Sequence, residues 1–554
     1  MASLHATRSP DDEPLEIGGH RYVPGTEMLY DSGMRSQLST LQHVKKGDSH
    51  ILLVPQPSLT DPNDPLCWSN AKKWITLLNG IWYSFNGAIT GPIMAAGMIG
   101  LTVTFDTTLQ RMTYANGATL ACQGAATTLW MPFAVKYGRR PVYLLSNLLM
   151  LVACIWLGIA ATGTYTPFII GRAFLGIFEA PIEALCPSTV TDLFFLHERG
   201  EKVSLYGLSV LSGNELGPVA SAFIIQSLGM KWAFFIVAMF IGASLISMFL
   251  TMPETRYSGS RPTLHASQDP GECSSTKSAV YHHEKLPEAG TQVQHIEQQE
   301  TVDRSTYLQG LKFWSKGEPT VNLLHTFVRP FVLLAYPTVA WSSLIYGLSL
   351  SWNVILGATT AQLFAPPPYG FDSSAQGLVF LSPFIGSLVG TYVCGPFADT
   401  VANYYTKRND GVREPEMRLP TCAIAAIITF IGAVIAGVTY HYGTHWAGPV
   451  VGYGILSAGA QMGATLAMTY SLDCHKELSA ELMVTISVVK SLIAWIWTWF
   501  INEWIISSGV LTVFCIIAAI NVAAYLTTLI LYWKGKDIRA WIQKKDLIGL
   551  LGVN

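Results

Sequence analysis

Residues 167–195 read PFIIGRAFLGIFEAPIEALCPSTVTDLFF, an apolar run in which four side chains are ionisable: Arg172, Glu179, Glu183 and Asp192. The run exceeds the about 20 residues that a helix needs to cross a bilayer. An ionisable group at the centre of such a helix costs roughly 3 kcal/mol, so its presence calls for a reason. The run therefore predicts a transmembrane helix that faces a hydrated, functional interior.

The composition of the whole chain is that of a membrane protein. Of its 554 residues, 50% are hydrophobic and 13% are charged, whereas soluble domains carry about 25% charged residues. Most of the 9 cysteines lie inside apolar runs, which is typical of a small apolar residue and not of a disulfide framework. Residues 1–72 contain no apolar run typical of a signal peptide, so we expect the first span to direct insertion.

Apolar windows of bilayer length recur along the chain at near-regular spacing. They predict twelve spans, at about 73–97, 112–135, 141–161, 167–191, 202–226, 232–252, 330–358, 374–398, 419–440, 447–470, 482–505 and 509–533. The other residues predict a disordered tail at 1–72, a polar central loop at 253–329 and a short basic tail at 534–554. We therefore expect an all-α membrane protein with twelve transmembrane helices in two six-helix halves, 73–252 and 330–533.

Lys and Arg residues favour one side of these spans. They lie between spans two and three, four and five, eight and nine, and ten and eleven (Lys476), and after span twelve, whereas the alternate loops contain only Arg111 and Lys231. Loops rich in Lys and Arg stay in the cytoplasm. Both termini and the central loop are therefore predicted to be cytoplasmic. Two halves arranged as parallel repeats would place a substrate site between them, near the midplane.

The turns after the second and eighth spans share a pattern of small and charged residues. Its members are Lys136, Gly138, Arg139, Arg140, Gly395 and Asp399. The turns resemble the signature G-x-x-x-D-[RK]-x-G-R-[RK] of the major facilitator superfamily. The first turn has Met131 and Val135 where the signature has glycine and acid, and the cations of the second turn come later, at Lys407 and Arg408. The resemblance implies an inner gate that latches the two halves.

The fifth span contains Gly213, Gly217 and Pro218 in the pattern G-x-x-x-G-P. It resembles the antiporter signature G-x-x-x-G-P-x-x-G-G, with Ser and Ala in place of the last two glycines. Together with the charged turn predicted at 197–202, it resembles the fungal drug:proton antiporter branch, near a group of polyamine and cation transporters. The resemblance implies proton-driven export of a drug, toxin or secondary metabolite.

The charges of the fourth span fall on one helical face. At about 100° per residue, Glu179 lies roughly 20° short of Arg172 and Glu183 roughly 20° past it. Pro181 should bend the helix between the two glutamates. In one interpretation Arg172 fixes an acidic partner while Glu179 or Glu183 exchanges a proton. In the other, Arg172 and a glutamate form a structural ion pair that only orients the bundle. Asp192, on another face near the cytoplasmic end, is predicted to be an interfacial residue or a gate latch.

Two further charges lie inside predicted spans. Glu215 in span five is either a second proton site, a partner of a cation in the other half, or a hydrogen-bonded and permanently protonated group. Lys490 in span eleven has Glu215, Glu179 and Asp473 as candidate partners. Both residues belong to the predicted substrate and proton pathway.

Asn79 and Asn86 lie seven residues apart on span one, hence on one face. They either line the cavity or form interhelical hydrogen bonds. The sequence contains no phosphate-binding loop, metal-ligand cluster or catalytic nucleophile set. We therefore expect no enzyme activity, no cofactor and no metal.

The patterns favour a proton-coupled transporter that works by alternating access. Its expected partners are protons, the lipid bilayer and a small substrate, cationic or amphipathic, and not nucleic acid. We expect a monomer in the plasma membrane. The alternatives are a proton symporter that imports polyamines or other organic cations, and a membrane sensor that transports nothing.

Overall fold

The computed structural model describes residues 61–257, 259, 310–311, 322–409, 412–475 and 478–545, with short pieces before residue 61. Most of the predicted N-terminal tail, the middle of the central loop, Lys476 and residues 546–554 lie outside the described residues. The pieces before residue 61 pair as short antiparallel strands: β1 (Glu16–Ile17) with β2 (His20–Arg21), β3 (Glu27–Met28) with β6 (Val412–Arg413), and β4 (His43–Lys46) with β5 (Ser49–Leu52).

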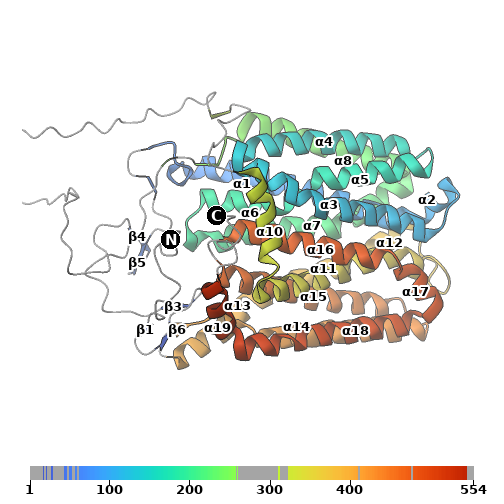
Figure 1. Cartoon of the computed structure of the whole chain (residues 1–554). Helices are drawn as coiled ribbons and strands as arrows, with labels where there is room; N and C mark the ends of the chain where they lie inside the picture. Colours follow the sequence, from blue (N-terminus) through green and yellow to red (C-terminus); the bar gives the residue numbers. More distant parts are fainter. Residues whose placement is uncertain are drawn as a thin grey trace, which may run out of the picture.

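Helices make up the rest of the described structure (Figure 1). The first half comprises η2 (Pro65–Cys67), α1 (Asn70–Thr90), η3 (Pro92–Gly97), α2 (Met98–Phe105), α3 (Leu109–Tyr137), α4 (Arg139–Ala160), α5 (Tyr165–Glu179), α6 (Ile182–Leu193), α7 (Leu196–Leu228) and α8 (Met230–Thr251). The second comprises α10 (Leu323–Leu333), α11 (Pro337–Phe364), α12 (Ser373–Val379), α13 (Leu381–Arg408), η4 (Pro415–Arg418), α14 (Thr421–His441), α15 (Ala447–Cys474), α16 (Ser479–Thr498), α17 (Ile501–Ser508), α18 (Val510–Leu526) and α19 (Thr528–Lys545).

Ten helical stretches of the described residues are long and apolar enough to cross a membrane. Two further stretches complete the predicted twelve. The first is α3, whose 29 residues include Arg111 and Lys136. The second is α5 with α6, an interrupted helix that contains the charges quoted at the outset. Both run alongside the other ten in Figure 1, so the fold is an all-α bundle of twelve transmembrane helices in two halves.

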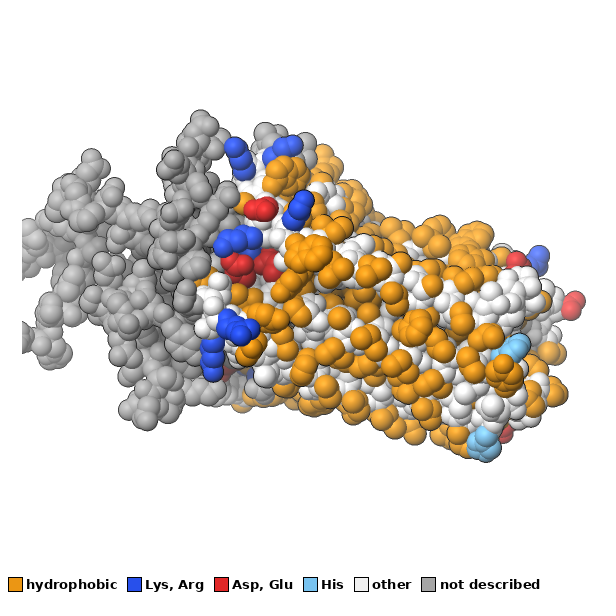
Figure 2. Space-filling model, turned by 90° about the horizontal axis from the view of Figure 1, so that it is seen from below, with side chains coloured by type: hydrophobic (Ala, Val, Ile, Leu, Met, Phe, Trp, Pro, Cys, Tyr) orange, Lys and Arg blue, Asp and Glu red, His pale blue; other side chains and the backbone are white. Residues whose placement is uncertain are grey.

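The surface of the bundle is divided in the way that a bilayer requires. Hydrophobic side chains cover its middle, and Lys and Arg side chains gather at one end (Figure 2). We call this the basic end; it holds Arg139, Arg418 and Arg539, and α10 lies across the bundle there (Figure 1). The opposite end, where α2, α12 and α17 lie, we call the far end.

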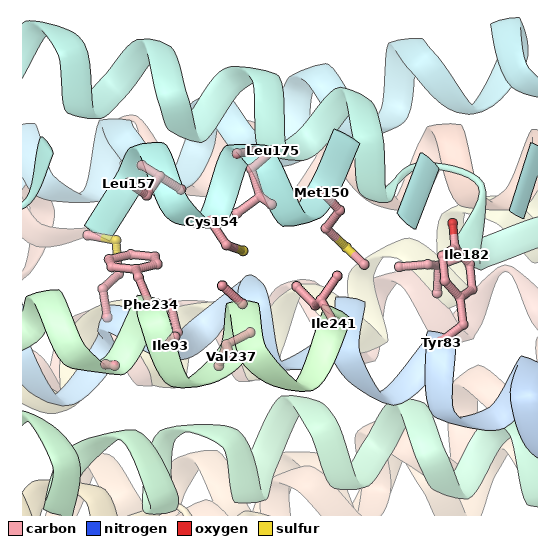
Figure 3. Close-up of a cluster of buried hydrophobic side chains, with 14 of the residues drawn as sticks. Tyr83, Ile93, Met150, Cys154, Leu157, Leu175, Ile182, Phe234, Val237 and Ile241 are labelled. Carbon is pink, nitrogen blue, oxygen red and sulfur yellow. The ribbon is translucent and has the colours of Figure 1, made fainter. Parts of the chain in front are cut away.

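Each half packs through large apolar side chains and close backbone contacts. Phe234 of α8, Cys154 of α4 and Leu175 of α5 fill the centre of the first half (Figure 3). A Cβ atom added at Gly176 of α5 would lie 2.2 Å from the carbonyl oxygen of Thr119, so only glycine permits this approach of α5 to α3. Small residues commonly allow such helix contacts in membranes.

The structure confirms the predicted bend at Pro181, because α5 ends at Glu179 and α6 begins at Ile182. The turn predicted at 197–202 is wrong: α7 begins at Leu196 and includes these residues. The helix begins this early because Glu198 lies in its first turn, where an acid is favourable. Arg199 donates hydrogen bonds back to the carbonyls of Thr191 and Phe194, which close the end of α6.

Candidate functional site

The two halves meet along two lines of contact, which we call the seams. In the first seam α3 packs on α16, and a Cβ at Gly124 would lie 2.8 Å from that of Ser491. In the second, α7 packs on α12 and α13, and a Cβ at Gly377 would lie 2.2 Å from that of Ala222. These distances show that the helices of opposite halves are in direct contact.

One ion pair crosses the first seam in the middle of the bundle. Lys490 Nζ on α16 donates to Glu183 Oε1 on α6, and Ser487 Oγ lies 3.5 Å from the other carboxylate oxygen. The side chains of Lys490 and Glu183 are 14% and 11% exposed. Glu183 was not among the partners predicted for Lys490, because the rotation of span eleven relative to span four is set only by the packing of the two halves.

Arg172 and Glu179 lie next to the C-terminal end of α1, where both contact Thr90. Arg172 donates to the carbonyls of Thr90 and Gly91 at 2.7 and 2.8 Å, and to Asn116 Oδ1 at 2.7 Å. Glu179 Oε2 accepts a 2.5 Å hydrogen bond from Thr90 Oγ1. The guanidinium therefore binds the free carbonyls of a helix C-terminus, where a cation is favourable. Sequence reasoning missed Thr90 and Asn116, since neither residue type is unusual in a span.

The two asparagines of α1 lie on its contact with α8, within the first half. Asn79 donates to Thr251 Oγ1 at 2.9 Å and accepts from Ser247 Oγ at 2.8 Å. Asn86 donates to the carbonyl of Phe240 at 3.5 Å. This is the interhelical hydrogen bonding named above as one of the two interpretations.

Hydrogen bonds of glutamine and asparagine side chains join the halves at the far end, in a set we call the far-end latch. Gln226 of α7 donates to Asp372 Oδ2 at 2.7 Å and accepts from the backbone N–H of Ser374 at 2.7 Å. Gln110 of α3 donates to the carbonyls of Thr498 and Trp499, each at 2.9 Å. Asn502 of α17 also bonds to Thr113 of α3, at 2.5 Å. The sequence signals for this latch were Gln110, just before the second predicted span, and Gln226, at the end of the fifth. A single glutamine at the end of a span is too common to single out.

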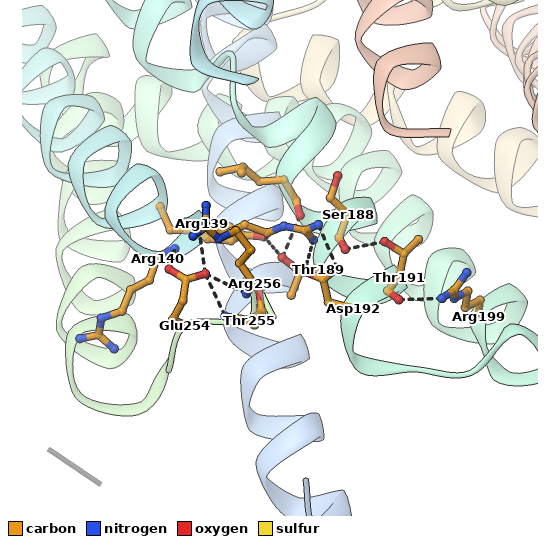
Figure 4. A network of polar contacts seen from close by, with 12 residues as sticks. Arg139, Arg140, Ser188, Thr189, Thr191, Asp192, Arg199, Glu254, Thr255 and Arg256 are labelled. Carbon is orange, nitrogen blue, oxygen red and sulfur yellow. Dashed lines mark hydrogen bonds and ion pairs between the residues drawn. The ribbon is translucent and has the colours of Figure 1, made fainter. Parts of the chain in front are cut away.

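The basic end of the first half holds a network of charges around Arg139 (Figure 4). Arg139 pairs with Asp192 at 2.7 Å. The backbone N–H groups of Arg139 and Arg140 donate to Glu254 at 2.9 and 3.1 Å. Arg256 donates to the carbonyl of Val135, the residue that replaces the acid of the signature. We call this network the first clamp; it joins α3, α4, α6 and the end of α8.

The turn of the first clamp depends on its glycine. Gly138 has a φ of +102°, a backbone conformation that residues with a Cβ atom rarely adopt. Lys136, the preceding signature cation, has its Nζ 5.9 Å from the ring centroid of Tyr137 and provides the second carbonyl that binds Arg256, at 2.6 Å.

The second half has an equivalent set at its basic end, which we call the second clamp. Asp399 accepts from Arg413 and Arg418 at 3.1 and 2.7 Å, and Arg418 also pairs with Asp473 at 2.8 Å. The cations expected there, Lys407 and Arg408, are not the ones that bind Asp399. They lie on the last turn of α13 itself, whereas Arg413 and Arg418 fold back from the following segment.

A buried pair completes the second clamp. Glu416 of η4 accepts two hydrogen bonds from Arg539 of α19, at 2.8 and 2.7 Å, and the two side chains are 8% and 1% exposed. Lys536, also on α19, pairs with Glu414 at 2.7 Å. Helix α19 thus continues into the range predicted as a basic tail, and this part of the helix is anchored to the segment before α14.

The three antiporter-motif residues lie in a single helix. Gly213 and Gly217 of α7 face α1, where a Cβ at Gly213 would lie 2.5 Å from that of Ala88. Pro218 lies inside the same helix. Gly395 of α13 faces open space, with nothing within 4 Å of an added Cβ.

Two halves of transmembrane helices that meet at a buried ion pair are typical of membrane transport proteins. The sequence model of the Major Facilitator Superfamily matches residues 76–498, so the chain belongs to this superfamily. An uncharacterised MFS-type transporter of Schizosaccharomyces pombe is 27% identical over 94% of each chain. The efflux pump radE of Floropilus chiversii is 23% identical over 87% of this chain and 83% of its own. The E. coli xylose transporter XylE, in a partially occluded inward-open conformation, shares the fold with a TM-score of 0.56 and 13% identity, over 83% of this chain and 99% of its own.

Proposed function

We propose that the protein is a proton-coupled exporter of a small organic compound that works by alternating access. The basic end is then cytoplasmic and the far end extracellular, in the plasma membrane, because Lys and Arg residues favour the cytoplasmic side. The Glu183–Lys490 ion pair is the single observation that carries the proposal. The efflux function named for radE supports the direction of transport.

The ion pair connects protonation to the contact between the halves. An ionised Glu183 attracts Lys490 strongly, since the pair is largely removed from water. Protonation of Glu183 removes one charge and leaves Lys490 with no ionised partner at this carboxyl, which is unfavourable in a buried site. The first seam then opens more easily, and a substrate can enter or leave between the halves. Loss of the proton restores the pair and closes the seam.

The Glu183→Gln variant tests this proposal. It preserves the shape of the side chain and a hydrogen-bond acceptor but cannot ionise. We expect a folded, membrane-inserted protein whose transport of fluorescent amphipathic dyes in proteoliposomes no longer responds to a pH gradient. Glu503→Gln is the matched control, because Glu503 of α17 is exposed at the far end. An unchanged response to the gradient in Glu183→Gln would contradict the proposal.

The direction of transport is tested with the gradient reversed. An exporter coupled to inward proton flow accumulates dye on the proton-rich side of the membrane. Accumulation on the opposite side would instead identify a proton symporter that imports its substrate. No net flux under either gradient, with folded protein, would indicate a sensor.

A further inference from the structure

Glu215 is a buried carboxyl group that the Glu183–Lys490 pair does not involve. It lies well inside α7, and the residue is 5% exposed. Among the described residues, none makes a hydrogen bond or ion pair with its side chain. In this it differs from Glu183, which binds Lys490, and from Glu179, which binds Thr90.

The position of Glu215 on α7 directs it to the second seam. At about 100° per residue, Val219 lies roughly 40° from Glu215 and Ala222 roughly 20° from it. Both lie within 3.5 Å of the Cβ that a side chain at Gly377 of α12 would have. Gly213, two residues before Glu215, is on the opposite face and packs on α1. Glu215 therefore faces the other half of the protein, about one helical turn from the closed contact.

The elements packed against α7 provide no nearby charge for this carboxyl. Neither α12 nor η3 contains an ionisable residue. The charges of the other packed helices lie towards their ends or on the first seam: Lys72, Lys73, Glu183, Asp192, Lys231, Asp399, Lys407 and Arg408. Burial of an ionised carboxylate without a partner is costly, and such a group takes up a proton instead.

We propose that Glu215 is a second proton-binding site, separate from Glu183, which the closed second seam shields from water. The carboxyl group carries its proton while α7 packs on α12. When the seam opens, water reaches the carboxyl group, the O–H bond breaks and water accepts the proton. The carboxylate takes a proton back from water before the seam closes again. The proposal rests on the proposed alternation of the halves.

Infrared spectroscopy of the purified protein in lipid nanodiscs tests the first part without any substrate. A buried protonated carboxyl gives a C=O band above the amide I region. Glu179 is a second buried carboxyl, so the band is assigned by difference. We expect the band in the wild-type spectrum minus the Glu215→Gln spectrum at neutral pH, and no loss of this component in Glu183→Gln or Glu503→Gln. Glu215→Asp should shift the band, which identifies its source if the glutamine variant folds poorly. A wild-type spectrum without the band, or identical band intensities in the wild type and Glu215→Gln, would overturn the proposal.

A variant that holds the second seam open tests the link to conformation. Gly377→Leu places a side chain where the closed seam has no space. We expect the band to be absent at neutral pH in this variant. The control is Gly395→Leu, whose added side chain meets open space and which should show the same band as the wild type. Persistence of the band in an opened Gly377→Leu protein would refute shielding by the seam. Neither infrared measurement depends on transport. The Glu183→Gln transport test can therefore fail while the Glu215 band is still observed, and the two failures are distinguishable.

Discussion

The contacts between the halves differ in kind from the contacts within each half. The far-end latch consists of hydrogen bonds from glutamine and asparagine side chains, one of them to the carboxylate of Asp372, and the Glu183–Lys490 ion pair crosses the first seam. The two clamps at the basic end consist of ion pairs that join helices of the same half. A neutral hydrogen bond contributes about 1 kcal/mol, whereas leaving a buried charge without its partner costs about 3–5 kcal/mol. Ion pairs thus hold each half together, and between the halves the far-end latch is easier to break than the first seam.

Breaking the second clamp should have the largest effect on stability. Glu416→Ala leaves the buried Arg539 without its carboxylate, which we expect to lower the free energy of unfolding by about 3–5 kcal/mol. Thermal melting in detergent measures the loss. Replacing both residues, as in Glu416→Met with Arg539→Leu, should recover most of it, because no charge is then left buried. Equal melting of Glu416→Ala and wild type would show that the clamp does not hold this half.

Overpacking the second seam should change conformation more than stability. Gly377→Ala forces apart α12 and α7, at a cost of about 1–3 kcal/mol to the closed state. We expect a longer distance between spin labels at Ser227 and Ser373, measured by double electron–electron resonance. The control is Gly395→Ala, where the added methyl group meets nothing within 4 Å. Identical distances in both variants would contradict a closed seam at Gly377.

Weakening the far-end latch should give a smaller shift in the same direction. Gln226→Leu removes two hydrogen bonds, to Asp372 and to the N–H of Ser374, which together contribute about 1–2 kcal/mol. The population with a long spin-label distance should rise several-fold. Ser227→Ala serves as control in unlabelled melting experiments, since Ser227 bonds only within α7. A lower melting temperature of Gln226→Leu with an unchanged distance between the labels would show that Gln226 stabilises only its own half.

The smallest expected effect is a pH dependence of stability that comes from a histidine beside the second clamp. His475, just after α15, bonds to Thr338 Oγ1 at 2.8 Å and stacks on Tyr336. Burial, with the nearby charge of Arg539, lowers the pKa of His475 from 6.5 to about 4. The unfolded chain therefore binds a proton at higher pH than the folded one, so stability falls as the pH drops from 6.5 towards 4.

The expected loss is about 1 kcal/mol between pH 6.5 and 5.5. Melting temperatures of the wild type and of His475→Gln over this range measure it. The variant should lose less stability on acidification. Parallel pH profiles would show that His475 is not the group responsible.

Most of the helical architecture could be predicted from the sequence, because span length and hydropathy depend on the residues of one segment. The bend at Pro181 followed from the missing N–H of proline. The start of α7 was missed because the charged residues 197–202 suit a first helical turn as well as a loop. The partner of Lys490 was missed because it depends on the rotation of two helices that belong to different halves.

The sequence by itself determined that this chain crosses the membrane in two sets of helices and carries charges inside them. Local hydrophobicity and helical periodicity suffice for that, since each span must satisfy its own backbone in lipid. Only the tertiary structure decided that Glu183 meets Lys490, that Arg172 binds the end of α1, and that Glu215 has no partner among the described residues. These pairings depend on how the helices are packed, which no single segment specifies.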